Sequence, residues 1–308
     1  MPSIGRSAGH AMNNVPHPDN PFHPDNHTAY GAWRERKLDA YPACTDELMV
    51  EVRDPLRLTS TELQALTTRC RKTNMALYTL AGTAEAAREL PARLGRQCGL
   101  TELDRNMGAD DDGITTLQVM DNEWRGSYIP YTNRPIHWHT DGYYNALSQQ
   151  IHGLILHCVS PAATGGENAL LDHEIAYLHL RDSNPDYIRA LMQTDVMTIP
   201  PNQRGDVELR PARSGPVFSI RADGRLHMRY TARPRNVIWR DEPLVHAALA
   251  ELDALLHSDS PFIFRATLQP GQGLICNNVL HDRSGFTDSD SCKRQLYRLR
   301  YYQRVAGT

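Results

Sequence analysis

The sequence predicts an α+β fold, in which one β-rich domain carries helices packed on its outside. Short apolar or alternating runs bounded by turns fill the middle and the end of the chain. Segments with helical periodicity interrupt them, and no internal repeat or clear linker divides the 308 residues. We therefore expect a single domain over residues 46–308, preceded by an irregular N-terminal arm over residues 1–45.

The arm is rich in Pro, Asn and His and has little periodic apolar content. We expect it to be either loose or laid across the body of the domain. Its histidines could suggest a metal-binding tail. Because they lack regular spacing and have a single cysteine nearby, a solvated arm is the favoured interpretation for His10, His17, His23 and His27.

The next elements alternate between strand and helix. Residues 47–52 (ELMVEV) and 75–82 (MALYTLAG) have the composition of short strands. The run TSTELQALTTRCRKTN opens with a capping box from Thr59 to Glu62, which predicts the start of a helix. The run TAEAARELPARLGRQCG predicts a second helix, bent or restarted at Pro91.

The remaining elements are mostly strands. The runs ITTLQVM, IHGLILHCV and FIFRATL predict strands, and VFSIRADGRLHMRY predicts a hairpin that turns at Asp223–Gly224. The runs HEIAYLHL, PDYIRALM and DEPLVHAALAELDALLH predict helices. In the last of these, Asp241 is the expected cap and Pro243 lies in the first turn. Its expected apolar face consists of Leu244, Ala248, Leu249, Leu252 and Leu256.

Composition excludes several classes of protein. The net charge is -3 and the pI is near 6.5, which argues against a nucleic-acid partner bound through a broad basic surface. The six cysteines form no CxxC pair, so we expect reduced thiols and no zinc ribbon. The N-terminus lacks the apolar core of a signal peptide, and no stretch approaches the ~20 apolar residues of a membrane span. We expect a cytoplasmic protein without a membrane partner, and a homo-oligomer remains an open alternative.

Metal-binding side chains alternate in the stretch NRPIHWHTDGYYN, residues 133–145. In an extended strand, His137, His139 and Asp141 would point to the same face. Two imidazoles and a carboxylate crowded together need either water or a metal ion to satisfy them. A solvated surface strand is one interpretation of this spacing, and a metal site is the other.

A further histidine could complete a metal site. The run PGQGLICNNVLHDRSGF contains a turn, a short apolar strand, two asparagines and then His281. Two histidines and one carboxylate on one octahedral face leave three positions open, as in non-haem Fe(II) oxygenases. Thirteen residues later, Arg294 lies in the strand-like run KRQLYRLRYYQ. Its guanidinium could bind the far end of a dicarboxylate bidentately.

With these motifs the chain resembles the taurine dioxygenase / γ-butyrobetaine hydroxylase (TauD/TfdA-like) superfamily of Fe(II)- and 2-oxoglutarate-dependent oxygenases. The matching stretches are HWHTDGYYN, LHCVSPAATGGENALLDHEIAYLHL, PGQGLICNNVLHDRSGF and KRQLYRLRYYQ, in the order of the family. The opening near residues 60–98 is also similar. The resemblance implies a double-stranded β-helix (jelly-roll) core with flanking α-helices.

Carried over residue by residue, the resemblance implies that His139, Asp141 and His281 ligate iron. It also implies that Arg294 pairs with the distal carboxylate of 2-oxoglutarate. Many relatives place Thr or Ser after the GGE/GGD turn to bond the same carboxylate, whereas this chain has Asn168, whose amide can still donate a hydrogen bond.

The expected substrate contacts rest on fewer residues. Arg298 matches a position that contacts the anionic substrate in the taurine enzymes. Arg283 lies where the family often has HGR, and it either holds the loop or touches substrate. Tyr143 and Tyr144 could line a substrate pocket, although consecutive tyrosines cannot both face inward from a strand. His137 has no role in the family pattern and is expected to be a half-buried histidine beside the strand end.

The resemblance implies a dioxygenase that uses Fe(II), 2-oxoglutarate and O₂ to hydroxylate a C–H bond of a small polar or anionic substrate, with release of succinate and CO₂. Two other classes remain alternatives. One is a cupin-like hydrolase or isomerase that holds a different metal through His137, His139 and Asp141. The other is a catalytically inert 2-oxoglutarate-binding module, for which the departure at Asn168 leaves room.

Overall fold

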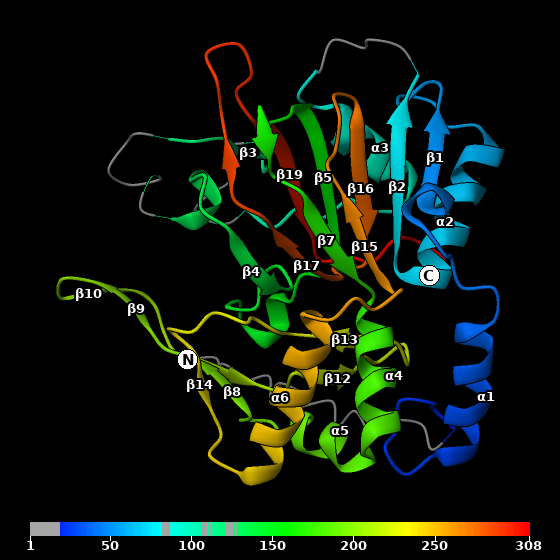
Figure 1. Ribbon diagram of the computed structural model, residues 1–308, viewed down its shortest axis with the longest axis vertical. Coiled ribbons are helices and arrows are strands. Elements are labelled where there is room, and N and C mark those ends of the chain that lie inside the picture. The colour runs from blue at the N-terminus through cyan, green and yellow to red at the C-terminus, as the bar shows by residue number, and fades with distance from the viewer. Residues whose placement is uncertain (1–18, 82–86, 106–109, 111, 121–125, 127) are drawn as a thin grey trace, which may run out of the picture.

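Two facing β-sheets form the centre of the molecule in the computed structural model (Figure 1). The structure describes residues 19–81, 87–105, 110, 112–120, 126 and 128–308. The larger sheet has six strands, in the order β1 (Met49–Val52), β2 (Met75–Leu80), β16 (Gln272–Cys276), β5 (Gly153–Ser160), β19 (Gln295–Tyr301) and β3 (Thr115–Leu117). The smaller sheet has four, in the order β15 (Ile263–Ala266), β7 (Asn168–Leu171), β17 (Leu280–Arg283) and β4 (Ile136–His139).

Strands β3, β4, β5 and β7 alternate between the two sheets, and so do β16, β17 and β19 after β15. This alternation is the winding of a double-stranded β-helix. The space between the sheets is filled by apolar side chains from both, among them Leu156, Leu274 and Leu296 of the larger sheet and Leu170 and Phe264 of the smaller. Strand β5 reads as a nearly continuous apolar run because both of its faces are covered.

Helices cover the outside of the barrel. Helices α2 (Ser60–Thr73) and α3 (Leu90–Gln97) pack on the larger sheet. The long connection between β7 and β15 folds into a separate layer built on α4 (His173–Ser183), α5 (Pro185–Leu191) and α6 (Pro243–Leu256), with α1 (His27–Leu38) beside it in Figure 1. None of the helices in the described ranges is long and apolar enough to cross a membrane.

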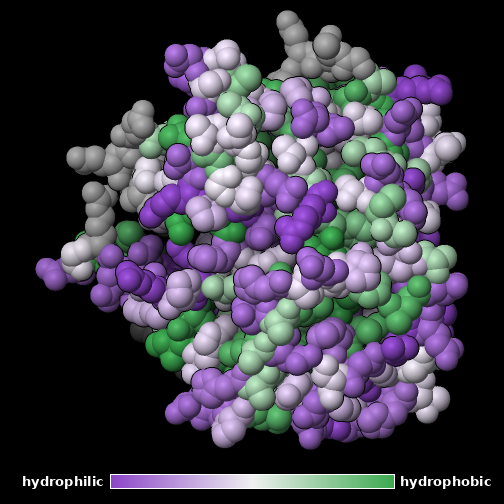
Figure 2. Space-filling model, viewed as in Figure 1, coloured by the Kyte–Doolittle hydropathy of each residue, from purple (hydrophilic) through white to green (hydrophobic). Residues whose placement is uncertain are grey.

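The same connection carries short strands. Strands β8 (Met197–Ile199), β11 (Arg213–Gly215) and β14 (Ile238–Trp239) form one small sheet. The pairs are β9 (Asn202–Arg204) with β10 (Val207–Arg210), β12 (Phe218–Ile220) with β13 (Leu226–Met228), and β6 (Thr164–Gly165) with β18 (Phe286–Thr287). Single 3₁₀ turns occur at η1 (Thr45–Leu48), η2 (Ile129–Tyr131) and η3 (Leu147–Gln149). Apolar side chains show on the surface over the α4–α6 layer (Figure 2), where Ile175, Leu178, Leu255 and Phe262 line a groove.

Several local predictions are confirmed. The side chain of Thr59 accepts from the backbone of Glu62, whose carboxylate accepts in return, so the capping box exists as predicted. The hairpin at residues 218–228 is also present. The helix expected at Pro91 begins at Leu90, and residues 82–86 lie outside the described ranges.

The cap and part of the apolar face predicted for α6 were wrong. Glu242, not Asp241, is the N-cap residue, and the helix begins at Pro243. Val245 and Leu255 are buried, whereas Leu244 is 37% exposed. The buried face is therefore rotated toward Val245, because α6 packs against both α4 and α5 rather than on one neighbour.

The prediction of an irregular arm was wrong for residues 27–38, which form α1. The side chain of Asn26 caps the first turn by accepting from the backbone N–H of Ala29. Tyr30 and Trp33, on one face, pack against Tyr177 of α4. The described part of the arm is thus laid across the body, and aromatic burial gives α1 its stability where its weak periodicity could not. His10 and His17 lie outside the described residues.

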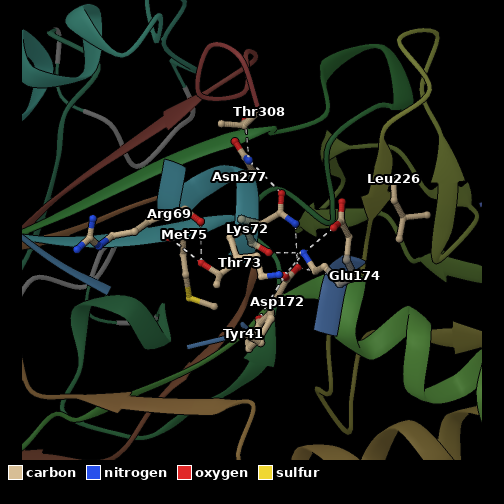
Figure 3. Close-up of polar contacts among 12 residues, drawn as sticks. Tyr41, Arg69, Lys72, Thr73, Met75, Asp172, Glu174, Leu226, Asn277 and Thr308 are labelled. Carbon is tan, nitrogen blue, oxygen red and sulfur yellow. Dashed lines mark hydrogen bonds and ion pairs between the residues drawn. The ribbon is translucent and has the colours of Figure 1, made fainter. Parts of the chain in front are cut away.

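A buried polar network fastens α1 to the rest of the fold. Lys37, almost fully buried, places its Nζ atom 2.6 Å from both the Asp172 and the Glu174 carboxylate oxygens. Burial opposes the charge on Lys37, but the two carboxylates outweigh it and raise its pKa. Asn74 donates to Asp172 and accepts from Asn277, which also donates to Thr308 (Figure 3). Helix α1, helix α4 and the C-terminus therefore share one set of hydrogen bonds.

Buried imidazoles give the fold a predicted pH dependence. His173 is 1% exposed and neither ring nitrogen has a partner among the described residues. Burial lowers its pKa to about 4, that of nearby His152 to about 3, and that of His227 well below its usual value. Unfolded histidine titrates near pH 6.5, so the unfolded state binds more protons between those values and stability falls as pH falls below about 6.5.

We expect the free energy of unfolding in urea to decrease by several kcal/mol between about pH 7 and pH 4.5, with His173 contributing up to about 3 kcal/mol. The matched variant His173→Gln should show a shallower dependence. An identical slope in the two proteins would show that His173 does not titrate with folding.

Candidate active site

The histidines and the aspartate singled out from the sequence meet at the end of the smaller sheet. His139 is the last residue of β4, Asp141 follows in the turn, and β17 carries His281. The β17–β4 register sets His281 directly opposite His139, with their rings 4.3 Å apart. Gly142 allows the turn, because its φ is +68° and a Cβ there would lie 2.4 Å from the Ile151 side chain.

These side chains offer three ligand atoms that all lie within 4.8 Å of one another, and no second such group occurs among the described residues. The Nε2 atom of His139 is 3.6 Å from Oδ1 of Asp141. The Nδ1 atom of His139 lies 2.9 Å from the carbonyl of His137, and that of His281 lies 2.9 Å from the carbonyl of Val279. Each Nδ1–H donates to its carbonyl, which leaves the Nε2 atom of each ring as the one with a lone pair for a metal.

The backbone of Asp141 is held by Asn278 in the turn between β16 and β17. The side-chain oxygen of Asn278 accepts from the N–H of Asp141, and its amide nitrogen donates to the carbonyls of Asp141 and Ile151. The amide side chain of Asn278 thus links the turn that carries Asp141 to the turn that precedes His281. This is a function for one of the two asparagines noted in the sequence.

The carboxylate of Asp141 is buried and incompletely satisfied. Its Oδ2 atom has no hydrogen-bond partner among the described residues, and its Oδ1 atom lies 3.4 Å from a guanidinium nitrogen of Arg298. Burial raises the pKa of Asp141, but the guanidinium of Arg298, together with that of Arg300, holds it well below the usual range. Burial, reinforced by His139, lowers the pKa of His281 to about 4. An ionised carboxylate and a neutral imidazole are the forms that ligate a metal.

The orphaned Oδ2 atom and the free Nε2 atoms fit a divalent first-row metal ion. Two imidazoles and one carboxylate on one side of the ion form the facial triad of non-haem iron sites. His137 is exposed, so the expectation of a half-buried histidine was wrong, and only its backbone carbonyl takes part, through the hydrogen bond from His139. The structure therefore does not bring the His137 side chain into the ligand group.

Arg294 and Asn168 line one pocket, beside the Gly165–Gly166 turn. Arg294 is 5% exposed and stacks on the ring of Phe286 at 5.2 Å. No carboxylate among the described residues lies within ion-pair distance of its guanidinium. Burial lowers its pKa, as expected for a cation that lacks an anion. A Cβ at Gly166 would lie 3.2 Å from Nε of Arg294, so the glycine makes room for the arginine.

The amide of Asn168 is partly occupied. Its nitrogen donates to the carbonyl of Asp282 at 2.7 Å. One amide hydrogen remains for an anion in the pocket, because a primary amide has two. Asn168 lies on β7, next to the strand β17 that carries His281, and Leu296 of the larger sheet also lines the pocket.

Arg283 is tied to the loop before β4 and not to the ligand group. It is 3% exposed, and its guanidinium donates to the backbone carbonyls of Thr132 and Arg134 and stacks on Phe286. Of the two roles weighed from the sequence, the structure supports holding the loop.

The two tyrosines lie in the turn after Asp141 rather than in a strand, so both can lie at the site. The ring of Tyr143 meets that of His139 edge-on, with centroids 6.4 Å apart, and its hydroxyl accepts from Arg233 at 3.0 Å. The hydroxyl of Tyr144 accepts from Arg300 at 2.7 Å, and Arg300 also pairs with Asp104. Sequence reasoning missed Arg233 and Arg300, since only the fold brings them to the tyrosines.

A family model described as "Taurine catabolism dioxygenase TauD, TfdA family" matches residues 76–300. Two relatives are named uridine-5′-phosphate dioxygenase. The one from Amycolatopsis sp is 30% identical over 170 residues, which cover 53% of this chain and 60% of the relative. The one from Streptomyces sp is 31% identical over 201 residues, which cover 61% and 69%. The match therefore spans less than two thirds of the Amycolatopsis protein.

Solved structures show the same fold. The structure of asparagine oxygenase in complex with Fe(II), 2S,3S-3-hydroxyasparagine and succinate has a TM-score of 0.57 at 17% identity and covers 79% of this chain and 80% of that chain. Together with the alternation of strands between two sheets, this likeness confirms the predicted jelly-roll core with flanking helices.

Proposed function

The chain belongs to the taurine catabolism dioxygenase TauD, TfdA family, and from that premise we propose that it is an Fe(II)- and 2-oxoglutarate-dependent dioxygenase. It hydroxylates a C–H bond of a small anionic substrate: one oxygen atom of O₂ enters the product and the other enters succinate, with release of CO₂. The observation that carries this proposal is the cluster of His139, Asp141 and His281, in which a buried carboxylate oxygen has no hydrogen-bond partner in the part of the chain that the structure describes.

In this proposal Nε2 of His139, Nε2 of His281 and the carboxylate of Asp141 hold the metal. Bound iron supplies the redox chemistry that activates O₂ and oxidises 2-oxoglutarate. Arg294 binds the distal carboxylate of 2-oxoglutarate, and the spare amide hydrogen of Asn168 donates to the same group. The absence of a described acidic partner for Arg294, which lines a pocket with Asn168 and stacks on Phe286, supports this role.

For the substrate we propose a nucleoside 5′-phosphate. The support is the name shared by the two relatives at 30% and 31% identity, together with the arginines beside the ligand group. Arg298 is the arginine expected from the family pattern to contact the substrate. We assign Tyr143 and Tyr144 to the same substrate pocket. We also propose that the chain works in a reducing compartment such as the cytoplasm, since all six cysteines are free thiols.

The test begins with anaerobic addition of Fe(II) and 2-oxoglutarate, followed by visible spectroscopy for the weak charge-transfer band. Uridine 5′-phosphate and O₂ are then added, and succinate is measured. The proposal predicts the band and substrate-dependent succinate. A metal-dependent hydrolase or isomerase would show no band, and an inert module would show the band without turnover for any substrate of a metabolite library.

Replacing Arg294 with alanine is expected to weaken the apparent affinity for 2-oxoglutarate by ten- to a hundredfold or more. A hydrogen bond to a charged group is worth about 1.5–3 kcal/mol, and each ~1.4 kcal/mol is tenfold in affinity. Titration of the charge-transfer band measures the effect. The control is Arg265→Ala, because this arginine is exposed and pairs with Glu167 outside the pocket. Unchanged affinity in Arg294→Ala would contradict the assigned role.

A further inference from the structure

One more arginine lies beside the ligand group, on a segment that extends the smaller sheet. Residues 230–232 run along the outer edge of β4: the N–H of Ala232 donates to the carbonyl of Trp138, and that of Thr140 donates to the carbonyl of Tyr230. A bridge pairs Thr231 with His139 itself. Arg233 follows at once, so the backbone that carries it is fixed next to a proposed iron ligand.

The guanidinium of Arg233 is held by Tyr143, whose hydroxyl accepts from it at 3.0 Å. The ring of Tyr143 stands edge-on to the ring of His139. Within the described part of the chain, Arg233 has no carboxylate within ion-pair distance and no other hydrogen-bond acceptor. A partly buried arginine has five donors, so most of its donors are left for a ligand.

Neighbouring arginines are committed elsewhere. Arg229 spends its donors on the backbone carbonyls of Tyr143, Met197, Arg213 and Gly215. Arg300 is taken by Asp104 and Tyr144, and Arg298 faces the carboxylate of the proposed ligand Asp141. Arg233 and Arg298 each make one hydrogen bond to the described residues, but that of Arg298 goes to the carboxylate of Asp141, whereas Arg233 meets no described carboxylate. Because Arg229 anchors the backbone of Tyr143, the hydroxyl that orients Arg233 is itself held in place.

We propose that Arg233 determines substrate specificity by binding the phosphate group of the substrate, with Tyr143 as the residue that positions it. The inference rests on the proposed function and names the residue that recognises the phosphate of the nucleoside 5′-phosphate at the same site. A phosphate monoester carries about -1.5 to -2 charges at pH 7 and three acceptor oxygens, which suit the planar donor array of arginine. A nucleoside without phosphate leaves these donors unpaired and is bound less well.

The experiment compares uridine 5′-phosphate with uridine on the enzyme loaded anaerobically with Fe(II) and 2-oxoglutarate. Calorimetry gives the dissociation constants, and succinate release gives kcat and KM. Arg233→Gln should weaken binding of uridine 5′-phosphate by about 10- to 100-fold, the range expected for a hydrogen bond to a charged group, and leave uridine unchanged. The loss should appear in KM more than in kcat. Arg233→Lys should recover part of it, since lysine keeps the charge but not the planar donors.

Two variants separate this role from a structural one. Tyr143→Phe should weaken the binding of uridine 5′-phosphate less than Arg233→Gln does, because the arginine remains. Arg235→Gln, two residues further along and exposed, should match the wild type. The proposal would be overturned if Arg233→Gln lost equal affinity for uridine 5′-phosphate and uridine, or lost none. It would also be overturned if the wild type bound the two compounds with equal affinity. A missing charge-transfer band with phosphate-selective binding intact would instead refute the proposed oxygenase function.

Discussion

Iron-dependent succinate formation is expected to disappear when alanine replaces any one of His139, Asp141 and His281. Each variant leaves two of three ligands and a gap on the face that holds the metal. Changes to residues that merely orient ligands cost about 10- to 100-fold in affinity or activity, so loss of a ligand should exceed this range. The measurements are succinate release under saturating 2-oxoglutarate and the dissociation constant of Fe(II) or Mn(II).

The matched control is His137→Ala on the same strand. The His137 side chain is exposed and outside the ligand group, and the carbonyl that orients His139 is retained in the variant. This protein should keep nearly wild-type metal affinity and turnover. If His137→Ala lost metal binding while His281→Ala retained it, the metal would be held by His137, His139 and Asp141, as in the hydrolase or isomerase alternative.

The second large effect concerns stability. Lys37→Ala is expected to lower the free energy of unfolding by about 3–5 kcal/mol, the usual consequence of removing one partner of a buried ion pair. The fully buried Asp172 and the mostly buried Glu174 would lose the cation that pairs with both of them (Figure 3). Urea unfolding at pH 7 measures the change.

Two further variants sharpen this test. Asp172→Asn combined with Lys37→Met removes the fully buried carboxylate together with the cation and should recover part of the lost stability, since only the mostly buried Glu174 is left without its partner. Lys293→Ala, on the exposed loop before β19, should change stability by less than about 0.5 kcal/mol. A loss below about 1 kcal/mol in Lys37→Ala would show that the network contributes little to folding.

The local elements and the chemistry of the site could be predicted from the sequence because their signals are short-range. The capping box from Thr59 to Glu62 depends on backbone geometry within one turn, and it formed as expected. The spacing of His139 and Asp141 likewise depends on one strand end and one glycine turn. Helix α1 was missed because its stability comes from Tyr30 and Trp33 packing on α4, about 150 residues away, and not from periodicity.

By itself the sequence determined which groups could bind metal and anion, since residue types carry that chemistry wherever the chain places them. The tertiary structure decided which of them meet. The β17–β4 register sets His281 opposite His139. Backbone carbonyls of the loop before β4 accept hydrogen bonds from the guanidinium of Arg283. The segment along the edge of β4 places Arg233 within hydrogen-bond distance of Tyr143. Such meetings depend on pairing between strands far apart in the chain, and a one-residue change of register would turn every side chain of a strand to the opposite face.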